Sequence, residues 1–171
     1  MGPSSPCSHH YVLKSKTGCM APLASFERIL VAIDGSENSI RAAEWAIGLA
    51  KKEGASLFAV NVIPTPVYAA PSASASATPA MKEFFDKARK DAETVVQDVV
   101  SRAESAGVKV RGEIIENVPS VVESITDYAD EWKVQLIVVG TRGLSGFRKL
   151  LLGSVSTALV SHAPCSVLVV R

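Results

Sequence analysis

The 171-residue chain is 47% hydrophobic and 20% charged, and its formal net charge is +1 at pH 7. A charge this close to zero gives no long-range attraction to nucleic acid or to an anionic membrane, so we expect neither partner. No stretch reaches the roughly 18 apolar residues of a membrane span. The three cysteines form no CxxC pair, and their odd number favours a reducing compartment, so the expected location is cytoplasmic.

The first 25 residues are polar and unpatterned, and we expect them to form a disordered leader without an apolar secretory run. The leader is interpreted either as a flexible extension or as an addition upstream of a natural start at Met20. Its potential metal ligands match no zinc-site spacing: Cys7, His9, His10 and Cys19. The periodic part of the chain predicts a single domain over 26–171.

The domain opens with a nearly continuous apolar run, 28–34 (RILVAID), which is typical of a strand covered on both faces. Ser36 can cap a following helix that stops at Gly54. The apolar positions of this helix recur every three or four residues: Ile40, Ala43, Ile47 and Ala50. Residues 56–63 (SLFAVNVI) predict a second strand. Residues 64–80, rich in proline, alanine and serine, then predict a long flexible connection, either a variable loop or a lid.

The second half of the domain continues the same alternation. A long helix ending near Gly107 is predicted to place one apolar face at Met81, Phe84, Phe85, Ala88, Ala92, Val95, Val96, Val99 and Ala103. Residues 108–116 alternate like a strand, and Pro119 suits the first turn of a helix that runs to Trp132. A buried strand (VQLIVV), a short helix (SVSTALVSH) and a final strand (SVLVV) complete the chain: 134–139, 154–162 and 166–170.

Strands that alternate with helices imply an α/β fold, with parallel strands joined by right-handed crossovers and helices on both faces of one sheet. In such open sheets, ligands bind beyond the carboxyl ends of the strands, where the winding reverses direction. Two segments carry suitable residues at strand ends. Asp34 closes the first predicted strand, and Gly140 closes the fourth.

The stretch 140–154 (GTRGLSGFRKLLLGS) predicts a phosphate-binding loop. Gly140 and Gly143 permit positive φ and let backbone N–H groups approach a ligand closely. Gly153 and Ser154 stand at the start of the next helix, where unpaired N–H groups and the helix dipole favour an anion, and Ser154 can add its hydroxyl. Three loop cations either neutralise phosphate charge or are merely solvated: Arg142, Arg148 and Lys149.

Asp34 has two interpretations. Its carboxylate can accept hydrogen bonds from ribose hydroxyls, or help to hold Mg²⁺ on a nucleotide's phosphates, although the chain suggests no metal site of its own. The alternative is a helix or turn cap. No dedicated catalyst is evident, because the loop lacks a Walker A lysine, Phe147 replaces the last glycine of a G-x-S-x-G elbow, and His162 suits a capping or packing role.

Both ends of the domain resemble the universal stress protein family. The opening segment is ILVAIDGSENSIRAAEWAIGLAKKEGASLFAVNVI, and the closing segment is IVVGTRGLSGFRKLLLGSVSTALVSHAPCSVLVV. The spacing Gly140, two residues, Gly143, nine residues, Gly153, Ser154 is similar to the nucleotide loop of the family's ATP-binding members. The resemblance implies a Rossmann-like open five-stranded parallel sheet of order 3-2-1-4-5. The leader and residues 64–80 inherit no role from it.

The resemblance also implies residue roles. Asp34 would contact ribose, Ala32 and the Val62 backbone would line the adenine pocket, and Val139 would pack against the base. The residues expected around the phosphates are Gly140, Gly143, Gly153, Ser154 and Val155. Many members are homodimers joined through the last strand, which here begins at Ser166 and ends at Arg171, and an apolar edge strand needs such a cover.

The expected function is therefore that of a dimeric, cytoplasmic, ATP-binding stress-response regulator whose nucleotide occupancy tunes its conformation or its partners. Two other classes stay open. A slow ATP hydrolase or an adenylating enzyme is one, although AIDGSENS lacks the SGGxDS-like loop that adenylating enzymes would be expected to show. The other is a chaperone-like interaction module that works without nucleotide.

Overall fold

The computed structural model describes residues 25–65, 79–143 and 152–171. The elements of this part of the chain are β1 (Arg28–Ala32), α1 (Glu37–Glu53), β2 (Ser56–Pro64), α2 (Pro79–Ser105), β3 (Val110–Val118), α3 (Val121–Glu131), β4 (Leu136–Gly140), α4 (Ser154–His162) and β5 (Ser166–Val170). The five strands form one parallel sheet of order β3-β2-β1-β4-β5, which confirms the predicted fold.

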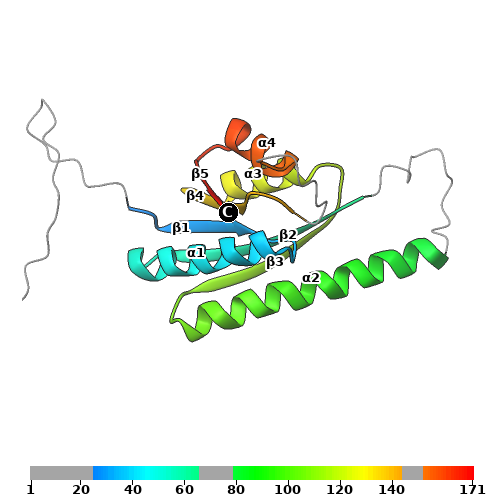
Figure 1. Cartoon of the computed structure of the whole chain (residues 1–171), viewed down its shortest axis with the longest axis horizontal. Helices are drawn as coiled ribbons and strands as arrows, with labels where there is room; N and C mark the ends of the chain where they lie inside the picture. The colour runs from blue at the N-terminus through cyan, green and yellow to red at the C-terminus, as the bar shows by residue number, and fades with distance from the viewer. Residues whose placement is uncertain (1–24, 66–78, 144–151) are drawn as a thin grey trace, which may run out of the picture.

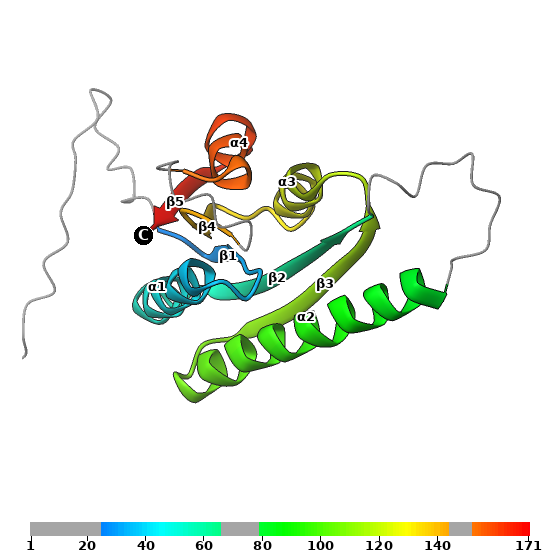
Figure 2. The ribbon, with the colours of Figure 1, turned by 45° about the vertical axis from the view of Figure 1, so that its right-hand side comes forward.

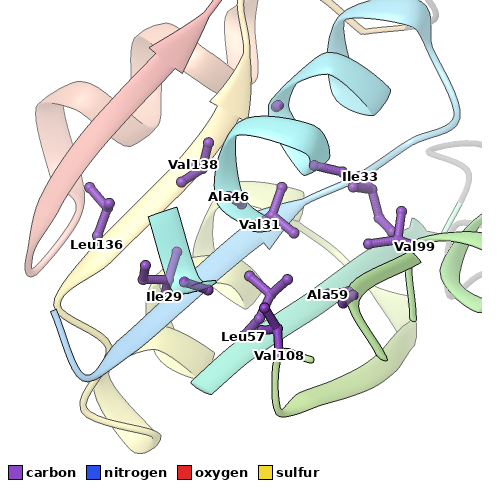
Figure 3. Packing of buried hydrophobic residues seen from close by; sticks show 14 of the residues in the cluster. Ile29, Val31, Ile33, Ala46, Leu57, Ala59, Val99, Val108, Leu136 and Val138 are labelled. Carbon is purple, nitrogen blue, oxygen red and sulfur yellow. The ribbon is translucent and has the colours of Figure 1, made fainter. Parts of the chain in front are cut away.

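Helices cover both faces of the sheet, α1 and α2 on one side and α3 and α4 on the other (Figures 1 and 2). Successive side chains of a strand point to opposite faces, so β1 sends Ile29 and Val31 toward α1 and α2, and Leu30 toward α3 and α4. Figure 3 shows Ala46 of α1 and Val99 of α2 gathered with the buried strand residues on the face of the sheet that α1 and α2 cover. Each large apolar side chain buried in this way contributes roughly 1.5–3 kcal/mol.

Helix α1 begins and ends where the sequence predicts. Ser36 is its N-cap, and the Ser36 hydroxyl oxygen accepts a hydrogen bond from the Ser39 N–H at 3.2 Å. Gly54 follows the last turn with φ of 70°, and its N–H donates to the Ala50 carbonyl. The predicted apolar positions are correct at Ala43 and Ala50, which are buried.

The predicted connection 64–80 is wrong at both ends. Strand β2 continues through Pro64, which pairs with Val118 of β3, and α2 already begins at Pro79. The N–H of the first helical residue has no intrahelical partner, so proline, which lacks this N–H, is a favourable first residue at position 79. Residues 66–78 lie outside the described residues.

Two further helix predictions need correction. Helix α3 begins at Val121 with Ser120 as its N-cap, so Pro119 precedes the helix instead of forming its first turn. Phe84 does not belong to a buried face of α2, because its side chain is 57% exposed. A 27-residue helix spans about 40 Å, whereas the nine residues of β3 span about 30 Å. The first turns of α2 therefore extend past the sheet (Figure 1).

None of the helices in the described part of the chain has the length and apolar character needed to cross a membrane.

Candidate functional site

A cleft of about 200 Å³ opens at the carboxyl ends of β1 and β4. These strands are neighbours, but β1 leads into α1 on one face of the sheet and β4 leads to α4 on the other, so the cleft lies where the winding reverses. The residues predicted for a nucleotide site all line it: Ala32, Asp34, Val62, Val139, Gly140, Gly143, Gly153, Ser154 and Val155. Arg142 also lines the cleft, whereas Arg148 and Lys149 lie outside the described residues.

The turn after β1 holds the Asp34 carboxylate in the cleft. Asp34 Oδ1 accepts a hydrogen bond from the Ser36 N–H at 3.0 Å, and the Asp34 N–H donates to Ser39 Oγ at 3.3 Å. Gly35, which lies between Asp34 and Ser36, has φ of 82°, a backbone conformation that residues other than glycine rarely adopt. Asp34 therefore caps its own turn and also lines the cleft, so its position is compatible with the capping interpretation and with the ligand-contact interpretation.

The turn after β1 is tied to the glycine loop after β4. Ser36 Oγ donates to the carbonyl of Arg142 at 3.3 Å. A Cβ added to Gly143 would overlap Asp34 Oδ2, so the backbone of the loop lies directly against the carboxylate. The carboxylate and the first part of the loop, which are 109 residues apart along the chain, form one wall of the cleft.

Gly140 has a structural reason that the sequence analysis did not identify. Among the described glycines only Gly35, Gly54 and Gly107 have positive φ, so neither Gly140 nor Gly143 uses the left-handed conformation. A Cβ at Gly140 would lie 2.8 Å from the backbone carbon and oxygen of Asn38, in the first turn of α1. Gly140 is therefore needed because α1 packs closely against the end of β4.

The start of α4 forms the opposite wall. Gly153 is the N-cap with extended backbone angles, φ of −75° and ψ of 166°, and it offers no side chain to cap the helix. Its own N–H donates to the Thr141 carbonyl at 2.7 Å, which joins the two ends of the loop. The first N–H groups of a helix have no intrahelical partner, so besides Gly153 these donors belong to Ser154, Val155 and Ser156, which all line the cleft.

Gly153 contrasts with the other two glycines. A Cβ there would lie 3.4 Å from the Thr141 carbonyl oxygen and 3.5 Å from Arg142 Cα, which are ordinary contact distances. The packing of the described residues therefore does not require glycine at this position.

The rest of the cleft is apolar and includes residues that the sequence analysis did not select. Val60 of β2 and Val121 and Ile125 of α3 line it together with Val62 and Val139. Val60 could have been found from Val62, because residues two apart in a strand share a face. Finding the α3 residues required knowing that this helix lies over the carboxyl end of β2.

Other predicted features fit the fold without entering the cleft. His162 lies in the last turn of α4, with Nδ1 2.9 Å from the Ala158 carbonyl oxygen, which is the expected capping position. Cys165 is partly buried in the core beside α3 and α4, and burial raises the pKa of its thiol. In the described part of the chain, no group of three or more histidine, cysteine, aspartate and glutamate side chains could hold a metal ion.

Comparison with known proteins identifies the family. The family model described as "Universal stress protein family" matches residues 25–171. A universal stress protein of Methanocaldococcus jannaschii is 32% identical over 146 residues, which cover 85% of this chain and 82% of that protein.

Solved structures agree with this match. The universal stress protein UspA from Lactobacillus plantarum superposes with a TM-score of 0.77 at 27% identity, covering 87% of this chain and all of that one. A universal stress protein solved in complex with cAMP superposes with a TM-score of 0.64 at 26% identity, covering 86% of this chain and 99% of that one. The match of the family model over the whole described domain shows that this chain belongs to the universal stress protein family.

Proposed function

We propose that this chain binds an adenine nucleotide, ATP in the first place, and acts as a stress-response regulator whose occupancy tunes its conformation or its choice of partner. The observation that carries the proposal is the composition of the cleft. It combines an apolar slot, a carboxylate at the end of β1 and an uncapped helix start, which suit a base, a ribose and phosphates in that order.

The apolar slot suits the adenine ring. Ile33 N–H donates to the Val60 carbonyl at 2.9 Å, so the backbone groups of Val60 face β1. Backbone groups alternate sides along a strand, and those of Val62 therefore face the same way. Pairing between β1 and β2 ends at Ala32 and Val60, which leaves the Val62 N–H and C=O without a partner from β1. One donor and one acceptor at the edge of an apolar slot match the edge of an adenine base.

The polar walls suit ribose and phosphate. Asp34 lies where a ribose hydroxyl can donate to its carboxylate, and a hydrogen bond to a charged group is worth roughly 1.5–3 kcal/mol. The Ser154 and Val155 N–H groups can donate hydrogen bonds to phosphate oxygens, and the helix dipole would add about 0.3–1 kcal/mol to the binding free energy. Mg²⁺ would arrive with the nucleotide and reach the protein at Asp34.

Gly153 supports the same assignment. Since the described residues around it would accept a Cβ, close approach of a ligand to the start of α4 would account for a bare backbone at this position. The universal stress protein solved with cAMP, at 26% identity, gives independent support for an adenine nucleotide as the ligand class.

Isothermal titration calorimetry with ATP, AMP, cAMP and GTP tests the proposal. We expect saturable binding of the adenine nucleotides. The affinity should fall at least tenfold in Asp34→Ala, and GTP should bind at least tenfold more weakly than ATP. Phosphate release measured on the same samples with Mg²⁺ distinguishes binding from slow hydrolysis. A protein that binds none of the four at millimolar concentration would contradict the proposal.

We further infer that the protein is a cytoplasmic homodimer joined through β5. In the described residues β5 pairs only with β4, and Val167, Leu168 and Val169 are only partly buried at this sheet edge. An antiparallel twin strand would cover them and satisfy the unpaired backbone groups. Light scattering after size exclusion should give twice the 18.0 kDa chain mass, and Leu168→Lys should give the monomer.

A further inference from the structure

A second groove lies between α3 and the edge strand β3, on the face of the sheet that carries α3 and α4. Its volume is about 420 Å³, and it shares no lining residue with the nucleotide cleft. Two periodicities place its side chains together. Arg111 and Glu113 are two apart on β3 and share a face, and Asp127, Tyr128 and Glu131 lie within one turn of α3.

The floor of this groove is aromatic and contains an unused polar group. Tyr128 stacks on Trp132 with ring centroids 5.9 Å apart and meets Phe58 edge to face at 6.1 Å. Only 8% of Tyr128 is exposed, and its buried hydroxyl has no hydrogen-bond partner among the residues that the structure describes. Buried hydroxyl groups are normally paired, so an unpaired one calls for an explanation.

Tyr128 lines the groove together with the charged residues of its rim. Burial raises the pKa of Tyr128, Glu113 and Glu131 raise it further, and Arg111 opposes them. These charged residues all line the groove.

The rim carries more negative than positive charge. The Arg111 guanidinium lies over the Trp132 ring, with Cζ 4.4 Å from the centroid, and its Nη2 is 2.9 Å from Glu113 Oε2, so these two charges compensate each other. Asp127 and Glu131 are exposed and have no ion pair within the described residues. Like charges four residues apart on a helix repel each other, so a cation bound between them would relieve a repulsion.

The chemistry of the rim and floor selects the kind of cation. No three acidic groups of the described residues are close enough to hold one metal ion, so the negative charges are spread along the groove. A matching ligand carries separated positive charges joined by apolar methylene groups that can lie on the aromatic floor. We propose that the groove between α3 and β3 binds an aliphatic diamine or polyamine, with ammonium groups on Asp127 and Glu131 and, once the side chains over it move apart, the buried Tyr128 hydroxyl as an additional acceptor.

Spermidine is the probe for the binding experiment, with n-butylamine as the singly charged control. The chain has two tryptophans, so Trp45→Phe leaves Trp132 as the single tryptophan reporter. Titration at low ionic strength should change the Trp132 emission to saturation, with spermidine at least tenfold tighter than n-butylamine. No saturable change up to millimolar spermidine would overturn the proposal, and so would tighter binding of a trilysine peptide, which would indicate a protein partner.

A charge-matched pair of double variants separates the groove from general surface attraction. Asp127→Asn with Glu131→Gln should weaken spermidine binding about tenfold or more. Glu53→Gln with Glu104→Gln removes the same charge from exposed positions of α1 and α2, on the opposite face of the sheet, and should change binding less than twofold. Equal losses in the two double variants would contradict a site in the groove.

Two further variants give effects that a merely structural role would not produce. Arg111→Met keeps an aliphatic chain on Trp132 but removes the competing cation, so it should tighten spermidine binding several-fold; a loss would count against the proposal. Tyr128→Phe removes the unpaired hydroxyl, and we expect an unchanged or higher melting temperature without spermidine together with weaker spermidine binding. Unchanged binding in this variant would exclude the hydroxyl as an acceptor and overturn that part of the assignment.

Discussion

Replacing Gly153 by valine should weaken nucleotide binding strongly while lowering the stability of the fold only slightly. A Cβ at this position would lie 3.4 Å from the Thr141 carbonyl oxygen and 3.5 Å from Arg142 Cα, so the described residues leave room for a Cβ. The backbone angles of −75° and 166° are allowed for valine as well as for glycine. In the proposed complex, by contrast, the added methyl groups would stand between the first N–H groups of α4 and the phosphates.

The two effects differ enough in size to be measured separately. Valine is a poorer N-cap than glycine, which should cost about 1 kcal/mol of stability and lower the melting temperature by about 2–4 °C. Losing one hydrogen bond to a charged phosphate costs roughly 1.5–3 kcal/mol, which corresponds to a loss of about 10- to 150-fold in ATP affinity. Calorimetry gives the dissociation constant, and thermal unfolding without ligand gives the stability.

Gly48→Ala is the matched control, because Gly48 is an exposed residue of α1 and a Cβ there has no neighbour within 4 Å in the described part of the chain. This variant should gain about 0.5–1 kcal/mol of helix stability and keep the affinity of the parent protein. If Gly153→Val binds ATP within twofold of the parent protein, the start of α4 does not hold the phosphates.

Three further changes test the architecture around the cleft. Gly140→Ala should lower the free energy of unfolding by about 1–3 kcal/mol in urea denaturation, because its Cβ would lie 2.8 Å from the Asn38 backbone; an unchanged midpoint would contradict this packing. Ser36→Ala removes the cap of α1 and the hydrogen bond to the Arg142 carbonyl and should cost about 1 kcal/mol, whereas Ser36→Asp should retain most of the capping. Burial raises the pKa of the Cys165 thiol, so the thiol's contribution to stability is present below the unfolded-state pKa and is lost as the pH rises through the folded-state pKa. Iodoacetamide should therefore label Cys165 more slowly in the native than in the unfolded protein at pH 8. Equal labelling rates would contradict the burial of Cys165.

The fold could be predicted because its signals are local and repeated. Continuous apolar runs mark strands covered on both faces, and capping residues such as Ser36 and Gly54 mark the ends of a helix. The strand order came from the family resemblance instead, since the amphipathic pattern alone does not determine which strands are neighbours. Three boundary errors lie at prolines: Pro64, Pro79 and Pro119 each permit more than one assignment when only neighbouring residues are considered.

The cleft could be predicted only in part, for a physical reason. Residues recognisable from a motif, such as Asp34 and Gly143, were found, but the reason for a glycine depends on what lies next to it in space. The sequence suggested that Gly140 permits positive φ and close approach of a ligand, whereas the structure adds the nearby backbone of Asn38, a neighbour that only the fold reveals. The same holds for Ile125, whose place in the cleft follows from how α3 packs over the sheet.

The most direct test of the central claim is a nuclear magnetic resonance titration of the ¹⁵N-labelled protein with ATP. If ATP binds in the cleft, the backbone amides of Asp34, Val62, Ser154 and Val155 should shift saturably, while the amide of Tyr128 in the second groove stays unchanged. Saturable shifts that leave these four amides in place and appear elsewhere on the molecule would contradict the assignment of the cleft.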